Sequence, residues 1–143
     1  MIPDDALVVL TDSLDQGTTN CIRNVAGLSP EQVPASWFVG SEIHLDGPDE
    51  IDLIVQPKVD ARAKSPSGCL LGAHAVPFWV LKKGRRYELI LATSADTLRV
   101  LDSRTNRYWD IKTTYSTAAS STVLLFKFYL AQYQLSEKRT EGN

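Results

Sequence analysis

The second half of the chain is a regular succession of short apolar and aromatic segments separated by turn residues. This feature constrains the fold more than any other. The centres of the segments lie about ten residues apart, which is typical of antiparallel strands joined by hairpins. The predicted strands cover residues 76–81, 87–93, 97–101, 108–115, 122–128 and, as the last, 133–135. The pattern therefore predicts an antiparallel meander.

Two further strands are predicted upstream of this meander. Residues 37–45 alternate with a period of two, so that Trp37, Val39, Ser41, Ile43 and Leu45 face the core. Phe38, Gly40, Glu42 and His44 would then face solvent. The apolar run 51–55 predicts a second strand, and residues 57–68, which are polar and rich in breakers, predict an exposed loop.

The first 36 residues have a mixed pattern. Asp4 and Asp5 can cap a short helix in which leucines recur at helical spacing. Val8 and Val9 make a strand possible as the alternative. We therefore predict a single α+β domain over residues 1–143, mainly an antiparallel β-sheet meander with a short helical N-terminal segment. Its parts are a mixed helical segment (1–36), a β-rich body (37–135) and a frayed tail (136–143). A pure β-sandwich is the alternative.

Composition excludes several classes of function. The 143 residues are 43% hydrophobic, enough for one domain with a core of its own. Fifteen Lys and Arg against seventeen Asp and Glu give a net charge of −2, so we expect no nucleic-acid partner and no attraction to anionic lipid. No apolar run approaches the ~20 residues of a membrane span, and the first residues predict no signal peptide.

The two cysteines, Cys21 and Cys69, both lie in surroundings that are typical of turns. They can form one disulfide or remain as two buried thiols, and the composition leaves both open. A zinc site would need both cysteines to converge with His44 and His74, the only histidines, and no zinc-ligand spacing is present. We therefore expect neither a metal site nor a cofactor.

Candidates for catalysis are weak. His74 follows small residues just before a predicted strand, and with Asp52 or Asp96 it could act as a general base. The alternative is a histidine that hydrogen-bonds the backbone at the start of that strand. The chain contains neither the nucleophile elbow of serine hydrolases nor the glycine-rich loops that bind nucleotides.

The densest charge in the chain is the basic hairpin tip. It comprises Lys82, Lys83, Arg85 and Arg86. Such a tip can contact an anionic partner, or it can simply be solvated and prevent edge pairing. The aromatic residues also have two possible roles: they can form an exposed platform that binds a glycan, or they can form part of the buried core. They are Trp79, Trp109, Tyr115, Phe126 and Phe128.

Residues 44–55, His-Leu-Asp-Gly-Pro-Asp-Glu-Ile-Asp-Leu-Ile-Val, resemble the acidic loop of the FG-GAP repeats of integrin-type propellers. The resemblance implies a calcium loop in which Asp46, Gly47 and Asp52 match the pattern. His44 and Pro48 stand where the family carries carboxylates, and calcium prefers six to eight oxygen ligands. We therefore predict no useful calcium affinity, and a structural role for Asp52, which would accept turn amides ahead of the strand.

A longer resemblance covers about the last hundred residues. Residues 37–45, 68–74 and 76–81, together with Arg104-Thr105-Asn106 and Asp110-Ile111, are similar to a group of small uncharacterised bacterial proteins, many of them exported. That group carries a C-terminal Thr-Asn-Gly-Tyr-x-Asp-Ile and Phe-Asp-Gly-x-x-Tyr pattern. Here Arg107 replaces the first glycine and Tyr129-Leu130 replaces Asp-Gly, which removes the chemistry of a tight turn from the last hairpin.

The resemblance implies a periplasmic or extracellular location, with the cytoplasm as the alternative, and it favours a Cys21–Cys69 disulfide. We accordingly expect a non-catalytic exported binding domain, for example an inhibitor or immunity-like factor, for a protein or an anionic cell-envelope ligand. The basic tip is the expected contact. A small hydrolase using His74 with an aspartate, and a structural or accessory subunit that pairs through its sheet edges, are the alternatives.

Overall fold

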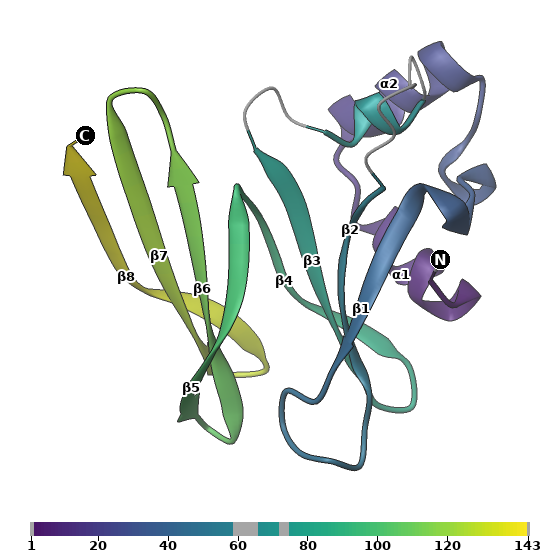
Figure 1. The fold of residues 1–143 in the computed structure, drawn as a ribbon. Helices are drawn as coiled ribbons and strands as arrows, with labels where there is room; N and C mark the ends of the chain where they lie inside the picture. The colour runs from purple at the N-terminus through teal and green to yellow at the C-terminus, as the bar shows by residue number, and fades with distance from the viewer. Residues whose placement is uncertain (1, 59–65, 72–74, 143) are drawn as a thin grey trace.

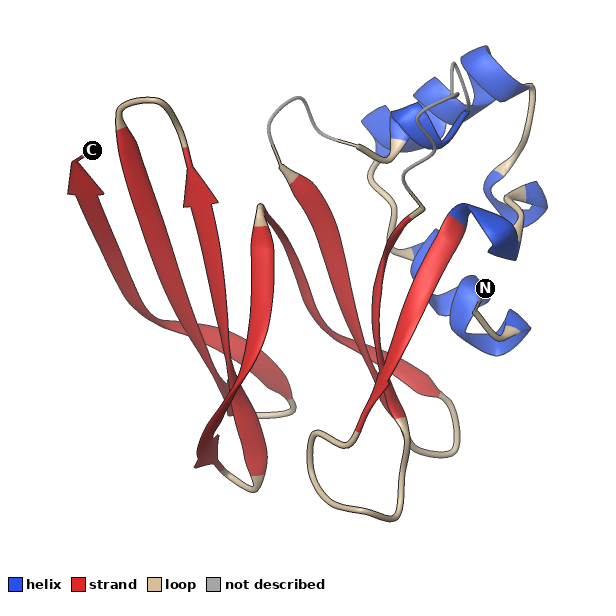
Figure 2. Cartoon of the chain, viewed as in Figure 1, coloured by secondary structure: helices blue, strands red, loops and turns tan. Residues whose placement is uncertain are grey.

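The computed structural model describes residues 2–58, 66–71 and 75–142. In this part of the chain, eight strands form two antiparallel four-stranded sheets, ordered β1-β2-β3-β4 and β5-β6-β7-β8 (Figures 1 and 2). The strands are β1 Phe38–Ile43, β2 Asp52–Pro57, β3 Val76–Lys83, β4 Tyr87–Ala95, β5 Thr97–Thr105, β6 Tyr108–Ser116, β7 Ser120–Tyr129 and β8 Gln132–Gly142. The predicted antiparallel meander is confirmed, and the chain is mostly β with a small helical part.

Two short helices precede the sheets. Helix α1 spans Asp4–Asp12 and α2 spans Gln16–Ala26, and single 3-10 turns follow at Pro30–Gln32, Ala35–Trp37 and Pro66–Cys69. The Asp15 carboxylate begins α2 by accepting the Thr18 N–H at 2.6 Å, and Gly27 ends it in the left-handed conformation. The residues before Cys21, which are typical of a turn, therefore form the first turn of a helix.

The first sheet (β1–β4) lies between the helices and the second sheet (β5–β8) (Figure 2). Because side chains alternate along a strand, Leu53 and Val55 pack under the helices while Ile54 between them packs toward the second sheet. Coverage of both faces explains why the two central strands, β2 and β3, carry nearly continuous apolar runs. It also corrects one prediction: Phe38, expected to face solvent, is fully buried under the helices, and Val39 is 39% exposed.

The last eight residues, predicted to fray, belong to the longest strand as far as Gly142. Strand β8 pairs with β7 along its length, from Tyr129↔Gln132 to Ser120↔Gly142. Its side chains are nearly all exposed, so the strand carries no apolar pattern. The prediction was wrong because backbone hydrogen bonds to a neighbouring strand hold an edge strand without apolar side chains.

Candidate functional site

Four hairpin connections lie at one end of the molecule, the lower end in Figure 1, and we call this the hairpin end. They are residues 44–51 between β1 and β2, 84–86 between β3 and β4, 106–107 between β5 and β6, and 130–131 between β7 and β8. Helix α2 lies toward the opposite end of the first sheet, whereas α1 lies nearer the β3–β4 connection, where Asp5 pairs with Lys83 at 3.3 Å. An antiparallel meander places every second connection at the same end, so the topology itself produces this cluster.

The buried carboxylate of Asp52 organises two of these connections. One oxygen accepts the Leu45 N–H at 3.0 Å, and the other accepts the Lys83 N–H at 2.8 Å. The Leu45 carbonyl in turn accepts the Trp109 N–H at 3.0 Å, which ties the 44–51 connection to the second sheet. Burial raises the pKa of Asp52.

The structure therefore gives Asp52 the predicted structural role as an acceptor of backbone amides. Its side chain has no exposed surface, which does not suit a group that exchanges protons with a substrate. Among the described residues, no cluster of three or more His, Cys, Asp or Glu side chains is arranged to hold a metal ion. His44 is exposed, as predicted, and its Nδ1 lies 2.9 Å from the Glu50 carbonyl.

The basic tip does not form one continuous cationic surface. Lys82 points toward the second sheet, 5.5 Å from the Tyr108 ring centroid, and its hydrogen bond with Tyr108 raises its pKa. Lys83 lies on the opposite face of β3, where it pairs with Asp5 at 3.3 Å and lies 4.3 Å from the Tyr87 ring centroid. Arg85 and Arg86 are exposed at the tip.

Aromatic rings pack behind the other two connections, 106–107 and 130–131, on the side of the protein interior. Tyr108 and Phe128 are stacked with centroids 3.6 Å apart, and Tyr133 meets both edge-on at 6.3 and 5.5 Å. The Tyr133 hydroxyl donates to the Trp109 carbonyl at 2.6 Å, and burial raises the pKa of Tyr133. Trp79 and Phe126 are also buried and belong to the core, whereas Trp109 and Tyr115 are half-buried and the Arg104 guanidinium lies 3.8 Å from the Trp109 ring centroid.

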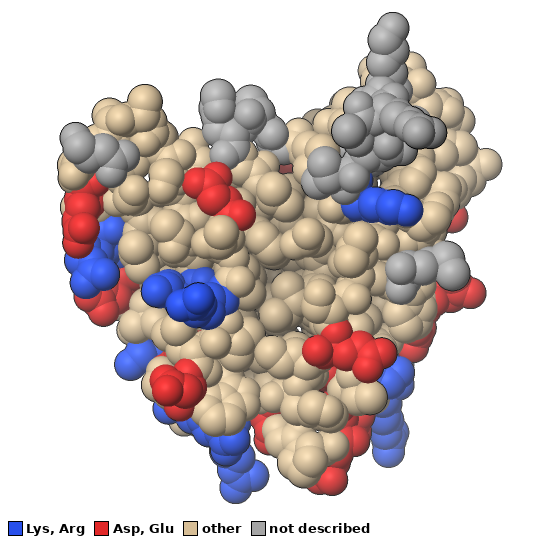
Figure 3. All heavy atoms as spheres, in the orientation of Figure 1, with Lys and Arg blue, Asp and Glu red and all other residues tan. Residues whose placement is uncertain are grey.

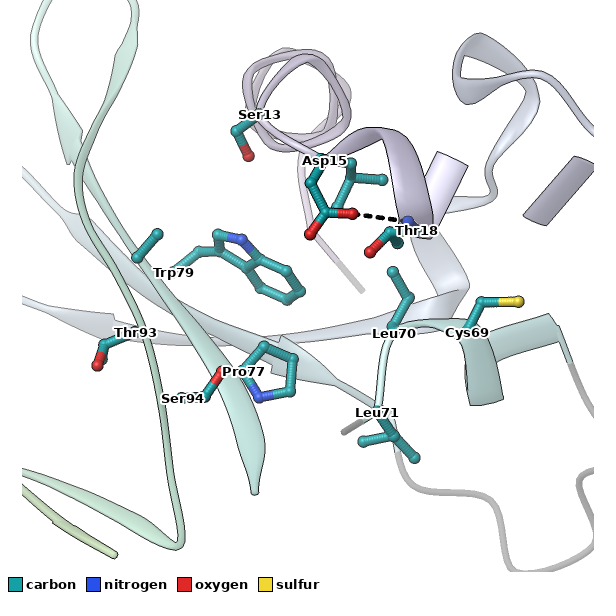
Figure 4. A pocket seen from close by; sticks show the side chains of 12 residues that line it. Ser13, Asp15, Thr18, Cys69, Leu70, Leu71, Pro77, Trp79, Thr93 and Ser94 are labelled. Carbon is teal, nitrogen blue, oxygen red and sulfur yellow. Dashed lines mark hydrogen bonds between the residues drawn. The ribbon is translucent and has the colours of Figure 1, made fainter. Parts of the chain in front are cut away.

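A cavity of about 410 Å³ opens where the α1–α2 turn meets the ends of β3 and β4 (Figure 4). Trp79 and Pro77 form its apolar wall, and Ser13, Asp15 and Thr18 contribute polar atoms from the helices. Some of these polar atoms already form hydrogen bonds within the fold. The hydrogen bond from the Thr18 N–H lowers the pKa of Asp15, and the Ser13 hydroxyl donates to the Leu10 carbonyl at 2.6 Å.

The disulfide is confirmed: Cys21 and Cys69 are bonded, with Cα atoms 5.7 Å apart. It joins α2 to the 3-10 turn Pro66–Cys69, beside the cavity and away from the hairpin end. His74, the weak catalytic candidate, lies outside the described residues. On the face shown in Figure 3, Lys and Arg are interspersed with Asp and Glu, without an extended patch of one sign.

Sequence reasoning missed one feature of the hairpin end. Leu130 and Ala131 form the whole β7–β8 connection with φ of 51° and 71°, and the Leu130 side chain is 76% exposed. The sequence already showed that this turn lacks glycine and asparagine, but not that the two segments pair there nonetheless. No described helix has both the length and the apolar character to cross a membrane. Comparison of the chain with known protein families, curated protein sequences and solved structures finds no significant match.

Proposed function

We propose that this protein is a non-catalytic binding domain that contacts a macromolecular partner through its hairpin end. The observation that supports the proposal is the convergence of four short connections on one end of a two-sheet framework. Loops on a rigid scaffold are the usual place for recognition, because the scaffold positions them at little cost in conformational entropy.

Mutual bonding between the connections strengthens this argument. Leu45 bonds both Asp52 and Trp109, and the Asn106 side-chain amide donates to the Phe128 carbonyl at 2.8 Å. The 44–51 and 106–107 connections are thus each tied to a neighbouring strand pair, and the basic tip is tied through Lys83 to Asp52. A surface held in this way loses little freedom on binding.

Arg85 and Arg86 are the charged contacts in this proposal. Both are exposed, and within the described part of the chain neither guanidinium forms an ion pair. Lys82 and Lys83, the other members of the basic tip, remain in the proposal as supports, because Lys82 already hydrogen-bonds Tyr108 and Lys83 already pairs with Asp5. An anionic surface of a protein partner is therefore the expected complement.

The test compares two double charge reversals that change the net charge equally. Arg85→Glu/Arg86→Glu is expected to weaken binding of a partner isolated on the native protein by about tenfold, and to flatten its salt dependence. Lys138→Glu/Arg139→Glu, on β8, is the control and should bind as the native protein does. Equal binding by all three proteins would contradict the proposal. A hydrolytic turnover lost in His74→Ala would support the hydrolase alternative instead.

Export of the protein belongs to the same proposal. A disulfide that joins α2 to a turn is typical of proteins that fold in an oxidising compartment. Thiol labelling of the protein in intact cells tests this directly. Unlabelled Cys21 and Cys69 are expected, whereas two reactive thiols in freshly opened cells would argue for the cytoplasm.

A further inference from the structure

The β7–β8 connection presents apolar side chains on a strained backbone. Tyr129↔Gln132 is the last pair of the two strands, so Leu130 and Ala131 alone make the turn. Both have positive φ, as a type I′ turn requires, and this region is disfavoured for residues with a Cβ. Asparagine followed by glycine is the usual choice at these two positions.

The same two residues expose apolar surface. The Leu130 side chain is 76% exposed and Tyr129 beside it is 55% exposed, and Leu130 has the highest exposure among the large hydrophobic residues of the described chain. The β5–β6 connection also has positive φ, at Asn106 and Arg107, but of the two only the β7–β8 turn combines it with exposed apolar side chains. Neither the strain nor the exposure stabilises the isolated fold, and strained residues of this kind are concentrated at functional sites.

Contacts around the turn hold this tip in one position. The Asn106 amide donates to the Phe128 carbonyl at 2.8 Å, and the Gln134 amide donates to the Tyr129 carbonyl at 2.9 Å. The stacked rings of Tyr108 and Phe128 lie on the interior side of these hydrogen bonds. The tip is therefore a braced projection, and such preorganisation favours affinity by reducing the entropy lost on binding.

We propose that Leu130 and Tyr129 are the apolar anchor of the hairpin end, and that they insert into an apolar pocket of a protein partner. This inference rests on the proposed binding function and specifies the chemistry of the contact. A few side chains that fill pockets at the centre of an interface carry most of its binding energy, and tyrosine is enriched among them. A membrane fits less well, because stable attachment needs a second signal and the chain has a net charge of −2.

Two substitutions in the same turn distinguish the effect of the apolar Leu130 side chain from the effect of the strained backbone. Leu130→Asn relaxes the backbone and removes the apolar side chain, and it should weaken binding to the isolated partner by at least about 30-fold. Ala131→Gly relaxes the neighbouring residue and keeps Leu130, so it should bind as the native protein does. Both should unfold at a higher urea concentration than the native protein, which excludes unfolding as the cause of lost binding.

Crosslinking identifies what surrounds the tip. A diazirine analogue of leucine is placed at position 130 and, as a control, at position 25, where Val25 on α2 is 61% exposed. In extract of the producing cells, position 130 should label apolar residues of one protein. Excess native protein or the Ala131→Gly variant should suppress this labelling, whereas Leu130→Asn should not.

Other outcomes overturn the inference or the function on which it rests. Labelling of lipid, or labelling at position 130 no greater than at position 25, would overturn the anchor. If a diazirine at position 85 still labels a protein that native protein displaces, only the anchor fails and the binding function stands. If neither position 85 nor position 130 gives a displaceable protein adduct, the proposed function fails as well.

Discussion

The Leu45 N–H donates to the Asp52 carboxylate at 3.0 Å, inside a site where neither residue has exposed surface. The same Leu45 accepts the Trp109 N–H through its carbonyl, and Asp52 also accepts the Lys83 N–H. A single buried carboxylate thus connects the ends of three strands in the first sheet, and Leu45 extends the connection to the second. The hairpin end depends on this pair.

Asp52→Asn is expected to destabilise the protein by about 2–3 kcal/mol. An amide keeps the shape but has one acceptor oxygen, so its NH₂ group would face a backbone N–H that then loses its partner. Urea unfolding measures the change. Asp49→Asn, in the adjoining 44–51 connection and exposed, should stay within about 0.5 kcal/mol of the native protein. Equal effects at the two positions would contradict the structural role of Asp52.

The titration of Asp52 should change the free energy of unfolding with pH. Its folded-state pKa is raised above the ordinary value of 3.8, chiefly by burial, so the folded state binds its proton more tightly than the unfolded state. Between 3.8 and the raised pKa, the contribution of Asp52 to the free energy of unfolding therefore falls as pH rises, by at most about 1.4 kcal/mol per pH unit.

The stability of the native protein relative to Asp52→Asn isolates this contribution, because the other carboxyl groups titrate in both proteins. Urea unfolding in steps from pH 3 upward should show the difference between them shrinking through that window and then becoming constant. A difference that grows with pH would mean that the hydrogen bonds from Leu45 and Lys83 outweigh burial, and that the pKa of Asp52 is lowered.

Removal of the disulfide should destabilise the helical layer. For a sequence separation of 48 residues, the chain-entropy argument gives about 4 kcal/mol for Cys21→Ser/Cys69→Ser. Because the bond lies on the helical side of the first sheet, amide hydrogen exchange should accelerate most in α2. Strands β6 and β7, in the second sheet, should keep their protection at low denaturant. Uniform acceleration would show that the two layers unfold as one unit.

Tyr133→Phe tests the aromatic support of the hairpin end. The substitution keeps the ring contacts with Tyr108 and Phe128 but removes the donor to the Trp109 carbonyl, so a loss of about 1–2 kcal/mol is expected. Tyr129→Phe is the matched control, because Tyr129 is 55% exposed, and its change in stability should be close to zero. An equally small effect at both positions would show that the Tyr133 hydroxyl does not stabilise the fold.

Local patterns in the sequence were sufficient for much of the β structure. Alternation and turn residues located each strand of the meander, because both are properties of a few consecutive residues. The structural role of Asp52 was also predictable, since an aspartate directly before an apolar strand is well placed to accept turn amides. These features need no knowledge of what lies across the core.

Other features depend on residues far apart in the sequence. Phe38 is buried because the helices cover the outer face of the first sheet, and residues 136–142 form a strand because β7 offers them a free edge. Lys82 and Lys83 separate because adjacent residues of β3 face different layers. The composition alone left the pairing of Cys21 with Cys69 undecided.

The hairpin end shows the same division most clearly. The sequence alone determined that hairpins would occur and that the last one lacks the usual turn residues. Only the tertiary structure decided that the chain pairs there nonetheless, with Leu130 and Ala131 in the left-handed region and Leu130 exposed. The physical reason is that pairing along all of β7 and β8, together with the Tyr108–Phe128 stack, outweighs the unfavourable backbone of two residues.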